Sequence, residues 1–142
     1  MGRISRGKKA LAAVLFLWVV LANCLAGCTR NDAPEKLRDL EFTVVGDGEV
    51  PEELKNIIGE KQAAPFKLTY SDGQGLYIVQ GYGEQETGGY SIAVRQLYLT
   101  EDSIVFDAEL IGPEKGADGG TEKSYPYIVV KTELLENPVV FQ

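Results

Sequence analysis

The segment Ser103-Ile104-Val105-Phe106-Asp107-Ala108-Glu109-Leu110-Ile111 has the clearest alternation of apolar and polar residues in the chain. Its apolar side chains recur at every second position, at Ile104, Phe106, Ala108 and Leu110. The acidic residues Asp107 and Glu109 lie between them on the opposite face. A period of two is typical of a β-strand with one buried and one solvent-facing side. The segment therefore predicts a strand over residues 103–111.

Other segments on both sides of this strand have the same character. We expect further strands at 40–45, 66–70, 76–82, 90–99, 127–132 and 139–141. Asp72-Gly73 is a turn signal between two of them, and it predicts a hairpin. The alternation slips at 96–99, where we expect a bulge or a strand end. Successive strands joined by short turns favour an antiparallel arrangement.

One short helix is expected near the start of this region. Pro51 suits a first helical turn, and Glu52 and Glu53 suit the positive end of the helix dipole. Leu54, Ile57 and Ile58 share one face, which would pack on a sheet, and the helix should end near Lys61. The predicted class is α+β, mostly antiparallel β, with a rolled sheet or small sandwich and one short N-terminal helix.

The first 28 residues have the pattern of a secretory signal. Four basic residues precede an apolar run over 10–22, and small residues follow it in Leu25-Ala26-Gly27-Cys28. These four residues resemble a lipobox, the bacterial lipoprotein signal. The resemblance implies that Cys28 is diacylated on sulfur, becomes the new N-terminus and anchors the protein in the membrane. Cys24 fits this pattern less well, because Asn23 precedes it.

Plain secretion and a retained membrane span are the alternatives for this segment. Residues 10–27 are near the lower limit of length for a span, and Asn23 interrupts them. We therefore expect a lipoprotein signal peptide at 1–27, a lipidated tether at 28–39 and a single domain at 40–142. The expected location is the extracytoplasmic face of a bacterial cell membrane.

Charge and composition narrow the function classes. Removing residues 1–27 takes four of the 14 basic residues and none of the 21 acidic ones, which leaves a net charge of −11. Such a surface repels nucleic-acid phosphates, so no nucleic-acid partner is expected. The chain has no histidine, which excludes Ser-His-Asp catalysis and His-ligated zinc. We assign no catalytic residue, metal or cofactor.

Hydrolysis by paired carboxylates stays open as an alternative. Glu84 with Glu86, and Glu101 with Asp102, are such pairs. Adjacent surface acids of this kind are more typical of a solvated face, and Glu101-Asp102 falls in an expected turn. The chain is therefore predicted not to be an enzyme.

Two glycine-rich segments interrupt the strand pattern. The segment 81–90 has four glycines, which permit a close backbone approach, but Glu84 and Glu86 without a lysine disfavour a phosphate site. It is either a long hairpin connection or a loop that presents its backbone and Tyr90 or Tyr82 to a partner. The segment 112–120 lacks the ligand spacing of a calcium loop, so a flexible turn is expected.

Ser124-Tyr125-Pro126-Tyr127 follows the second glycine-rich segment at the entrance to a strand. Tyrosines are enriched at protein interfaces, so the pair could form an aromatic contact patch. The alternative is that one tyrosine belongs to the core and the other lies at its rim.

Four segments together resemble the C-terminal domain of PrcB-type protease complex subunits. They are Leu76–Gly83, Thr87–Ile92, Glu109–Pro113 and Ser124–Tyr127, and they span about half of the expected domain. Members of this family are often lipoproteins, and the name comes from an accessory protein of a subtilisin-like surface protease. The resemblance implies a non-catalytic envelope protein that associates with a protease.

Thr87–Tyr90, the glycine loop that ends at Gly119-Gly120, and Tyr125–Tyr127 show a weaker resemblance to the three short loops of chagasin-type cysteine-protease inhibitors, which occur in a similar order. The leading hypothesis is an accessory binding module in which loops 81–90 and 112–127 lie close together and contact an envelope protease. The contact residues would be Thr87, Gly88, Gly89, Tyr90, Tyr125, Pro126 and Tyr127. The alternatives are an inhibitor module, a purely structural envelope protein or a small carboxylate-dependent enzyme.

Overall fold

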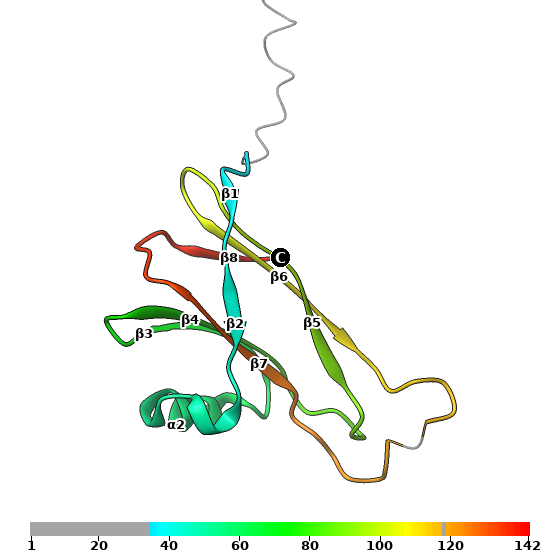
Figure 1. Ribbon diagram of the computed structural model, residues 1–142. Helices are drawn as coiled ribbons and strands as arrows, with labels where there is room; N and C mark the ends of the chain where they lie inside the picture. The colour runs from blue at the N-terminus through cyan, green and yellow to red at the C-terminus, as the bar shows by residue number, and fades with distance from the viewer. Residues whose placement is uncertain (1–34, 118) are drawn as a thin grey trace, which may run out of the picture. The chain divides into compact units, whose positions relative to one another are not determined.

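A computed structural model describes residues 35–117 and 119–142, which form one folded unit (Figure 1). In this part of the chain, two four-stranded β-sheets accompany one α-helix and one single-turn 3₁₀ helix. The predicted class, α+β and mostly antiparallel β with one short helix, is confirmed. The predicted signal peptide and the acylated Cys28 lie outside the described residues.

The first sheet has the order β1-β5-β6-β8 and the second has the order β2-β7-β4-β3. The strands of the first sheet are β1 (Arg38–Asp39), β5 (Ser91–Leu99), β6 (Ile104–Ile111) and β8 (Val139–Phe141). Those of the second are β2 (Phe42–Val44), β3 (Pro65–Ser71), β4 (Gly75–Tyr82) and β7 (Tyr127–Glu133). Neighbours are antiparallel except β6 and β8, which are parallel.

The strand expected at 40–45 is divided between the two sheets. Leu40 is 4% exposed, and its backbone N–H donates to the Leu97 carbonyl at 3.0 Å. The chain then leaves the first sheet and joins β7 of the second at Phe42. Leu40 is an apolar residue whose side chain is buried in the core at this crossing. The hydropathy pattern alone therefore did not distinguish it from a strand residue.

The expected irregularity near 96–99 is a register shift in β5. The pairing with β6 shifts between Val94 and Gln96, which leaves Arg95 as the extra residue. A bulge inserts one residue in this way and lets the strand continue, here to Leu99. The bulge therefore lies one residue before the segment where the alternation slips.

Side chains from both sheets form one core cluster. Its buried members are Leu40, Leu76, Ile78, Leu97, Ile104, Phe106, Ala108, Ile128 and Val130. This set includes Ile104, Phe106 and Ala108, three of the four β6 positions that the period of two predicted to face inward, whereas Leu110 is only partly buried and is not a member. Burying apolar side chains of this size stabilises a fold by about 1.5–3 kcal/mol each.

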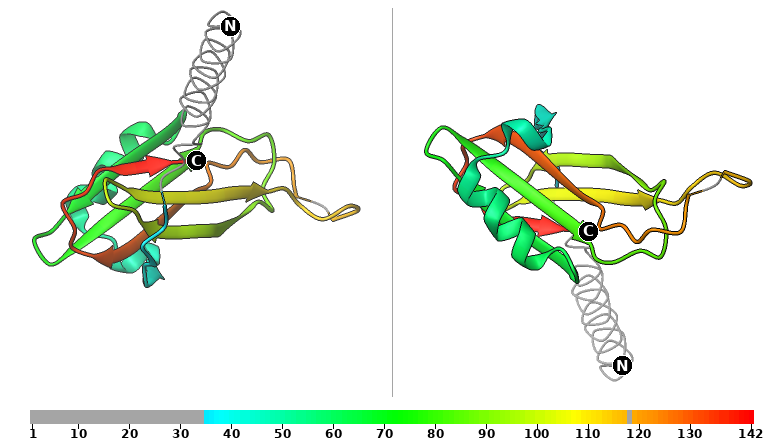
Figure 2. Two further views of the ribbon diagram at one scale, coloured as in Figure 1. Left: turned by 90° about the horizontal axis from the view of Figure 1, so that it is seen from above. Right: turned by 90° about the horizontal axis from the view of Figure 1, so that it is seen from below.

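Helix α2 (Glu52–Lys61) covers the other face of the second sheet (Figure 2). Its buried residues, Leu54 and Ile58, pack in a second cluster with Tyr77 and Val79 of β4. Strand β4 is therefore buried on both faces, which explains why its sequence is nearly continuous in apolar residues. The predicted helix and its end at Lys61 are confirmed.

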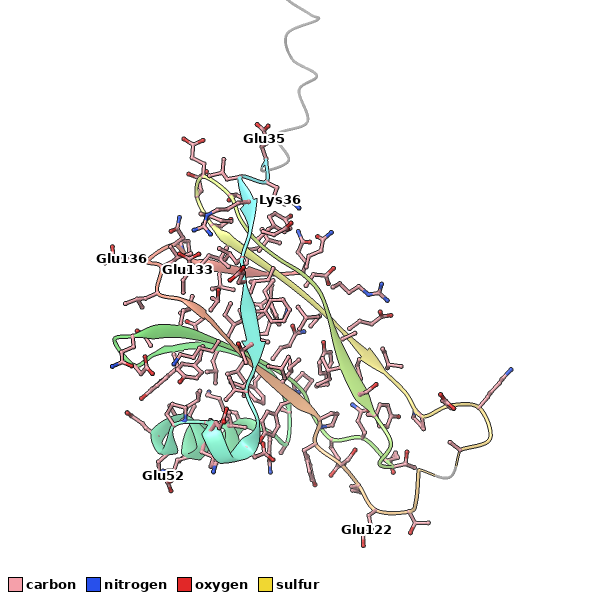
Figure 3. The ribbon with its side chains drawn as sticks, in the orientation of Figure 1. Glu35, Lys36, Glu52, Glu122, Glu133 and Glu136 are labelled. Carbon is pink, nitrogen blue, oxygen red and sulfur yellow. The ribbon has the colours of Figure 1, made fainter. Side chains whose placement is uncertain are left out.

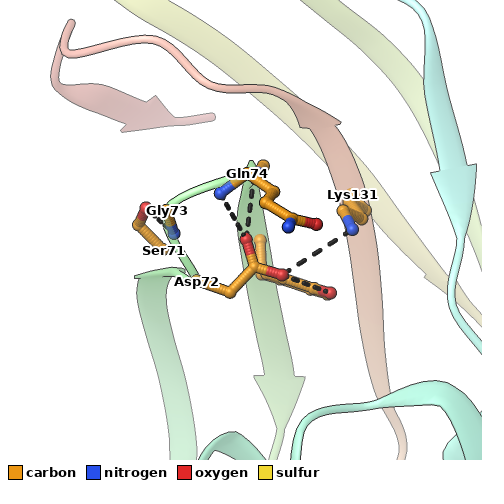
Figure 4. A network of polar contacts seen from close by, with 7 residues as sticks. Ser71, Asp72, Gly73, Gln74 and Lys131 are labelled. Atoms are coloured by element: carbon orange, nitrogen blue, oxygen red, sulfur yellow. Dashed lines mark hydrogen bonds and ion pairs between the residues drawn. The ribbon is translucent and has the colours of Figure 1, made fainter.

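The hairpin between β3 and β4 turns at Asp72-Gly73, as predicted (Figure 4). One carboxylate oxygen of Asp72 accepts the backbone N–H groups of Gln74 and Gly75, each at 2.8 Å. These bonds lower the pKa of Asp72 below its ordinary value, and the Lys131 ammonium lowers it further. Gly73 has a φ of 85°, a conformation that glycine adopts without strain.

The N-terminal edge of the described region is already part of the sheet structure. Arg38–Asp39 pairs with Leu99 and Tyr98 at the far end of β5. Among residues 35–117 and 119–142, no helix is both long enough and apolar enough to cross a membrane.

Candidate functional site

The two glycine-rich segments lie against each other at one end of the sheets, and we refer to residues 83–90 together with 112–117 and 119–126 as the loop pair. Gln85 and Ser124 exchange two backbone hydrogen bonds, at 2.8 and 3.0 Å. The Gly88 N–H donates to the Gly119 carbonyl at 2.9 Å. The predicted proximity of the two loops is therefore confirmed.

Side chains tie the loop pair together at two further points. The Ser124 hydroxyl donates to the Thr87 carbonyl at 2.6 Å. The Glu84 carboxylate accepts hydrogen bonds from the Lys123 ammonium and the Tyr125 hydroxyl, both at 3.1 Å. A carboxylate between two donors from the opposite loop adds a side-chain link between the loops.

This contact changes the acidity of all three groups. Hydrogen bonds from Lys123 and then Tyr125 lower the pKa of Glu84 below its ordinary value. The bond to Glu84 raises the pKa of Lys123, and it also raises the pKa of Tyr125. All three side chains are solvent-exposed, so the contact contributes little to global stability.

Glycine is needed where the two loops touch. A β-carbon at position 119 would lie 2.6 Å from the Gly88 carbonyl oxygen, which is closer than van der Waals contact allows. Gly89 has a φ of 84°, and a β-carbon there would also meet the Pro113 ring at 3.1 Å. The glycines that suggested a phosphate cradle therefore permit close packing between loops.

The three candidate tyrosines have separate surroundings. Tyr125 is 37% exposed and bonds Glu84, whereas Tyr90 is half-buried beside Gly112. The Tyr127 ring packs against the cluster under helix α2, and its hydroxyl donates to Asp47 at 2.8 Å. Burial and this bond raise the pKa of Tyr127 to about 12. Tyr125 and Tyr127 thus match the alternative of one rim and one core-packed tyrosine.

The remaining candidate residues lie within the loop pair. Thr87, Gly88 and Gly89 form the contact with the second loop, and Pro126 accepts a hydrogen bond from the Tyr82 N–H at 3.0 Å. Their role in contacting a partner stays a prediction. Glu84 and Lys123 were not predicted as a pair, because they are far apart in sequence and no local spacing relates them.

The carboxylate pairs do not converge with other ligands. Glu101 and Asp102 lie exposed in the turn between β5 and β6. In the side-chain view, Glu35, Glu52, Glu122 and Glu136 point outward from different parts of the fold (Figure 3). Among the residues placed in the structure, no group of three or more Asp, Glu, His and Cys side chains could hold a metal ion.

A concave region, separate from the loop pair, lies where the chain crosses between the sheets. It has a volume of about 850 Å³ and is lined by residues 38–43 and 131–133. The Arg38 guanidinium and the Glu133 carboxylate form an ion pair across it at 2.7 Å. It lies at the β1 end of the fold, away from the loop pair.

Comparison with protein families identifies the region that contains the loop pair. Residues 76–133 match the model of the family described as PrcB C-terminal. This segment of the chain is therefore similar to the PrcB C-terminal family. The PrcB C-terminal segment begins in β4 and ends with β7, so it includes both loops. Comparisons with curated proteins and with solved structures give no match.

Proposed function

We propose that this protein is a non-catalytic, lipid-anchored accessory subunit that binds an envelope protease through the loop pair. The family assignment supports association with a protease complex. The observation that carries the proposal is that two loops far apart in sequence are hydrogen-bonded into one unit inside the PrcB C-terminal segment.

The loop pair is already ordered by its own bonds, which favours binding. Ordering a loop at the moment of association reduces affinity, and preorganisation avoids this loss. The Glu84, Lys123 and Tyr125 side chains are exposed and offer donors, an acceptor and an aromatic ring. These groups suit the polar rim of a protein interface.

The position of the loop pair suits a membrane-anchored protein. The chain enters the sheets where the Leu37 N–H donates to the Leu99 carbonyl, and the loop pair lies at the other end of β5. The nine residues of β5 extend about 30 Å. We therefore propose tethering by acyl chains on Cys28 in the outer face of a bacterial cell membrane, with the entry of the chain and the loop pair at opposite ends of the folded unit.

The test compares two exposed glutamates that each bond a tyrosine hydroxyl. Glu84→Lys reverses the charge of a side chain inside the loop pair. Glu53→Lys reverses the charge of a carboxylate away from the loops, which accepts a hydrogen bond from the Tyr70 hydroxyl at 3.0 Å. Each variant of residues 29–142 is used to capture proteins from a native envelope extract, and captured proteases are quantified by mass spectrometry. A purified captured protease is then titrated with each variant.

We expect the unmodified protein and Glu53→Lys to bind the protease and Glu84→Lys to lose it. Equal recovery with all three proteins would exclude the loop pair as the contact. Recovery of no protease by any of them would leave a purely structural role as the better description.

An inhibitor module is the second candidate, and one observation favours it. The three segments that resemble chagasin-type loops meet at one end of the fold, since Gly88 bonds Gly119 and Ser124 bonds the Thr87 carbonyl. Adding residues 29–142 to serine, cysteine and metalloproteases should then reduce the activity of one class. Unchanged activity in every class would remove this candidate.

A further inference from the structure

Strand β6 is covered along only half of its outer edge. The short strand β8 runs parallel to Ile104–Phe106, and the Gln142 N–H donates to the Phe106 carbonyl at 2.9 Å. Beyond that point, no strand among the described residues pairs with 107–111 on this side. The edge of β6 nearest the loop pair is therefore open.

The open half presents backbone groups in a defined order. Ile104 donates its N–H toward the β8 side, to the Pro138 carbonyl at 2.8 Å, and Phe106 accepts on that side. Alternate residues of a strand direct their backbone groups to the same edge. Ala108 and Leu110 therefore direct an N–H and a carbonyl to the open edge, in continuation of the β8 pairing.

A pocket of about 250 Å³ lies on the β3–β4 hairpin. It is lined by Pro65, Phe66, Lys67, Gln80, Gly81 and Tyr82. Lys67 pairs with Gln80 across the two strands, so both side chains are on the face toward the first sheet. The Lys67 ammonium is 5.6 Å from the centre of the Phe141 ring, which places this pocket next to the end of β8.

Two lining residues carry buried polar atoms without a protein partner. They are the Gln80 side-chain oxygen and the Tyr82 hydroxyl, and Gln80 is only 7% exposed. Burial, and to a lesser extent the Asp107 charge, raises the pKa of Tyr82, so its hydroxyl keeps its proton. A buried polar atom without a partner destabilises the free protein, and a ligand with complementary hydrogen-bonding groups would supply the missing bonds.

We propose that the open half of β6 and the adjacent pocket bind an extended peptide segment of a partner protein, which adds a strand parallel to β6 and places a carboxamide side chain in the pocket. This goes beyond the function proposed for the loop pair and uses a different surface. Strand addition to an open edge is a common mode of peptide recognition.

The chemistry of the pocket selects the side chain. The Gln80 and Tyr82 oxygens have almost no accessible surface in the free protein, so their side chains turn toward the pocket when a carboxamide enters; it then donates to both oxygens and accepts from the Lys67 ammonium. The volume of about 250 Å³ accommodates one side chain of this size. The direction of β8 sets the direction of the added strand, since a parallel strand continues its hydrogen-bond pattern.

The experiment selects binders from a display library of random heptapeptides against residues 29–142. We expect the selected peptides to be extended sequences with Asn or Gln at one position. Adding such a peptide should slow hydrogen exchange at the Ala108 and Leu110 amides, while exchange at Gly88 in the loop pair stays the same. Failure to select a peptide, or protection confined to the loop pair, would overturn the proposal.

Two variants separate binding from folding. Gln80→Met and Tyr82→Phe each remove a buried polar atom, so both should raise the urea midpoint of the free protein. Each should weaken peptide binding about tenfold, the loss of about one hydrogen bond. Tyr70→Phe is the matched control, because Tyr70 bonds Glu53 outside the pocket, and it should bind peptide normally.

Other outcomes of these measurements would also contradict the proposal. Lower urea midpoints with unchanged peptide affinity would give Gln80 and Tyr82 a structural role only. Protection of Ala108 that grows with protein concentration, without peptide, would show that a second copy of the chain occupies the edge.

Discussion

The two ends of the β5–β6 hairpin are held by different means. At one end the strands are joined directly by the turn around Thr100 and Ser103, which are both buried. At the other end they continue into the loop pair, whose two loops are joined by backbone bonds and by glycine contacts. The short turn adds the buried Thr100 side chain to a backbone bond from the Thr100 N–H to the Ser103 carbonyl, whereas the long loops are joined mainly through their backbones.

Thr100 makes most of the polar contacts in the turn. Its hydroxyl oxygen accepts the Ser103 N–H at 3.0 Å and lies 2.9 Å from the Ser103 hydroxyl. It also accepts the Asp102 N–H at 3.3 Å. The comparison shows that a buried end depends on one satisfied side chain, whereas an exposed end leaves side chains available for a partner.

The largest effect is expected at the turn end. Thr100→Val keeps the shape of the side chain and removes its hydroxyl, so buried groups of Ser103 lose their partner. The free energy of unfolding should fall by about 1–3 kcal/mol. Urea unfolding measures it, with Thr43→Val on exposed strand β2 as the control. A loss no greater than the control would show that the turn does not depend on this hydroxyl.

A smaller effect on stability is expected at the loop contact. Gly119→Ala places a β-carbon 2.6 Å from the Gly88 oxygen and should push the loops apart at a cost of about 1 kcal/mol. Hydrogen exchange at the Gly88 amide should increase. Gly48→Ala, where nothing lies within 4 Å, is the control. Unchanged exchange at Gly88 would mean that the loops adjust without separating.

Tyr127 links the loop end to the 3₁₀ helix η1 (Asp47–Glu49) and adds a pH dependence. Its pKa is about 12 in the folded protein and about 10 when unfolded. Its contribution to stability should be complete below pH 10 and decrease as the pH rises toward 12. Urea titrations at pH 7–12 test this. In Tyr127→Phe this decrease should be smaller, because only the other tyrosines with raised pKa values still contribute to it, and about 1 kcal/mol should be lost at pH 7.

The same titrations can contradict the role of Tyr127. An identical decrease above pH 10 in the wild type and in Tyr127→Phe would assign the alkaline loss of stability to other tyrosines.

The smallest effect is expected at Glu84, where the contact is exposed. Its pKa is lowered by Lys123, so the contact should persist at neutral pH and be lost as the pH falls through that lowered value. Lys123→Gln should move the pKa of Glu84 back toward its ordinary value without a measurable change in the urea midpoint. NMR titration of the Glu84 carboxyl measures this shift, and no difference between the two proteins would contradict it.

Local patterns predicted most elements and few of the contacts between them. The alternation at 103–111, the face shared by Leu54 and Ile58, and the Asp72-Gly73 turn all depend on near neighbours in sequence. Each was therefore predictable from spacing and turn chemistry. The bulge at Arg95 was placed approximately, because the hydropathy slip lies beside the extra residue.

The candidate site was only partly predictable. The glycines and tyrosines of the two loops stand out in composition, and their proximity was part of the binding-module hypothesis. The contact between Glu84, Lys123 and Tyr125 did not, because it depends on how two long loops meet. The packing of Tyr127 against the second cluster also required the position of helix α2.

The sequence by itself determined the α+β class, the hairpin turn, the helix and the PrcB C-terminal resemblance, since each resides in short-range patterns of residues. The tertiary structure decided that residues 38–44 divide between two sheets, that β8 joins β6 in parallel, and that no strand of the described residues pairs with the outer edge of 107–111. The physical reason is that strand period is a local property. The choice of strand partner depends instead on which distant apolar surfaces are buried together.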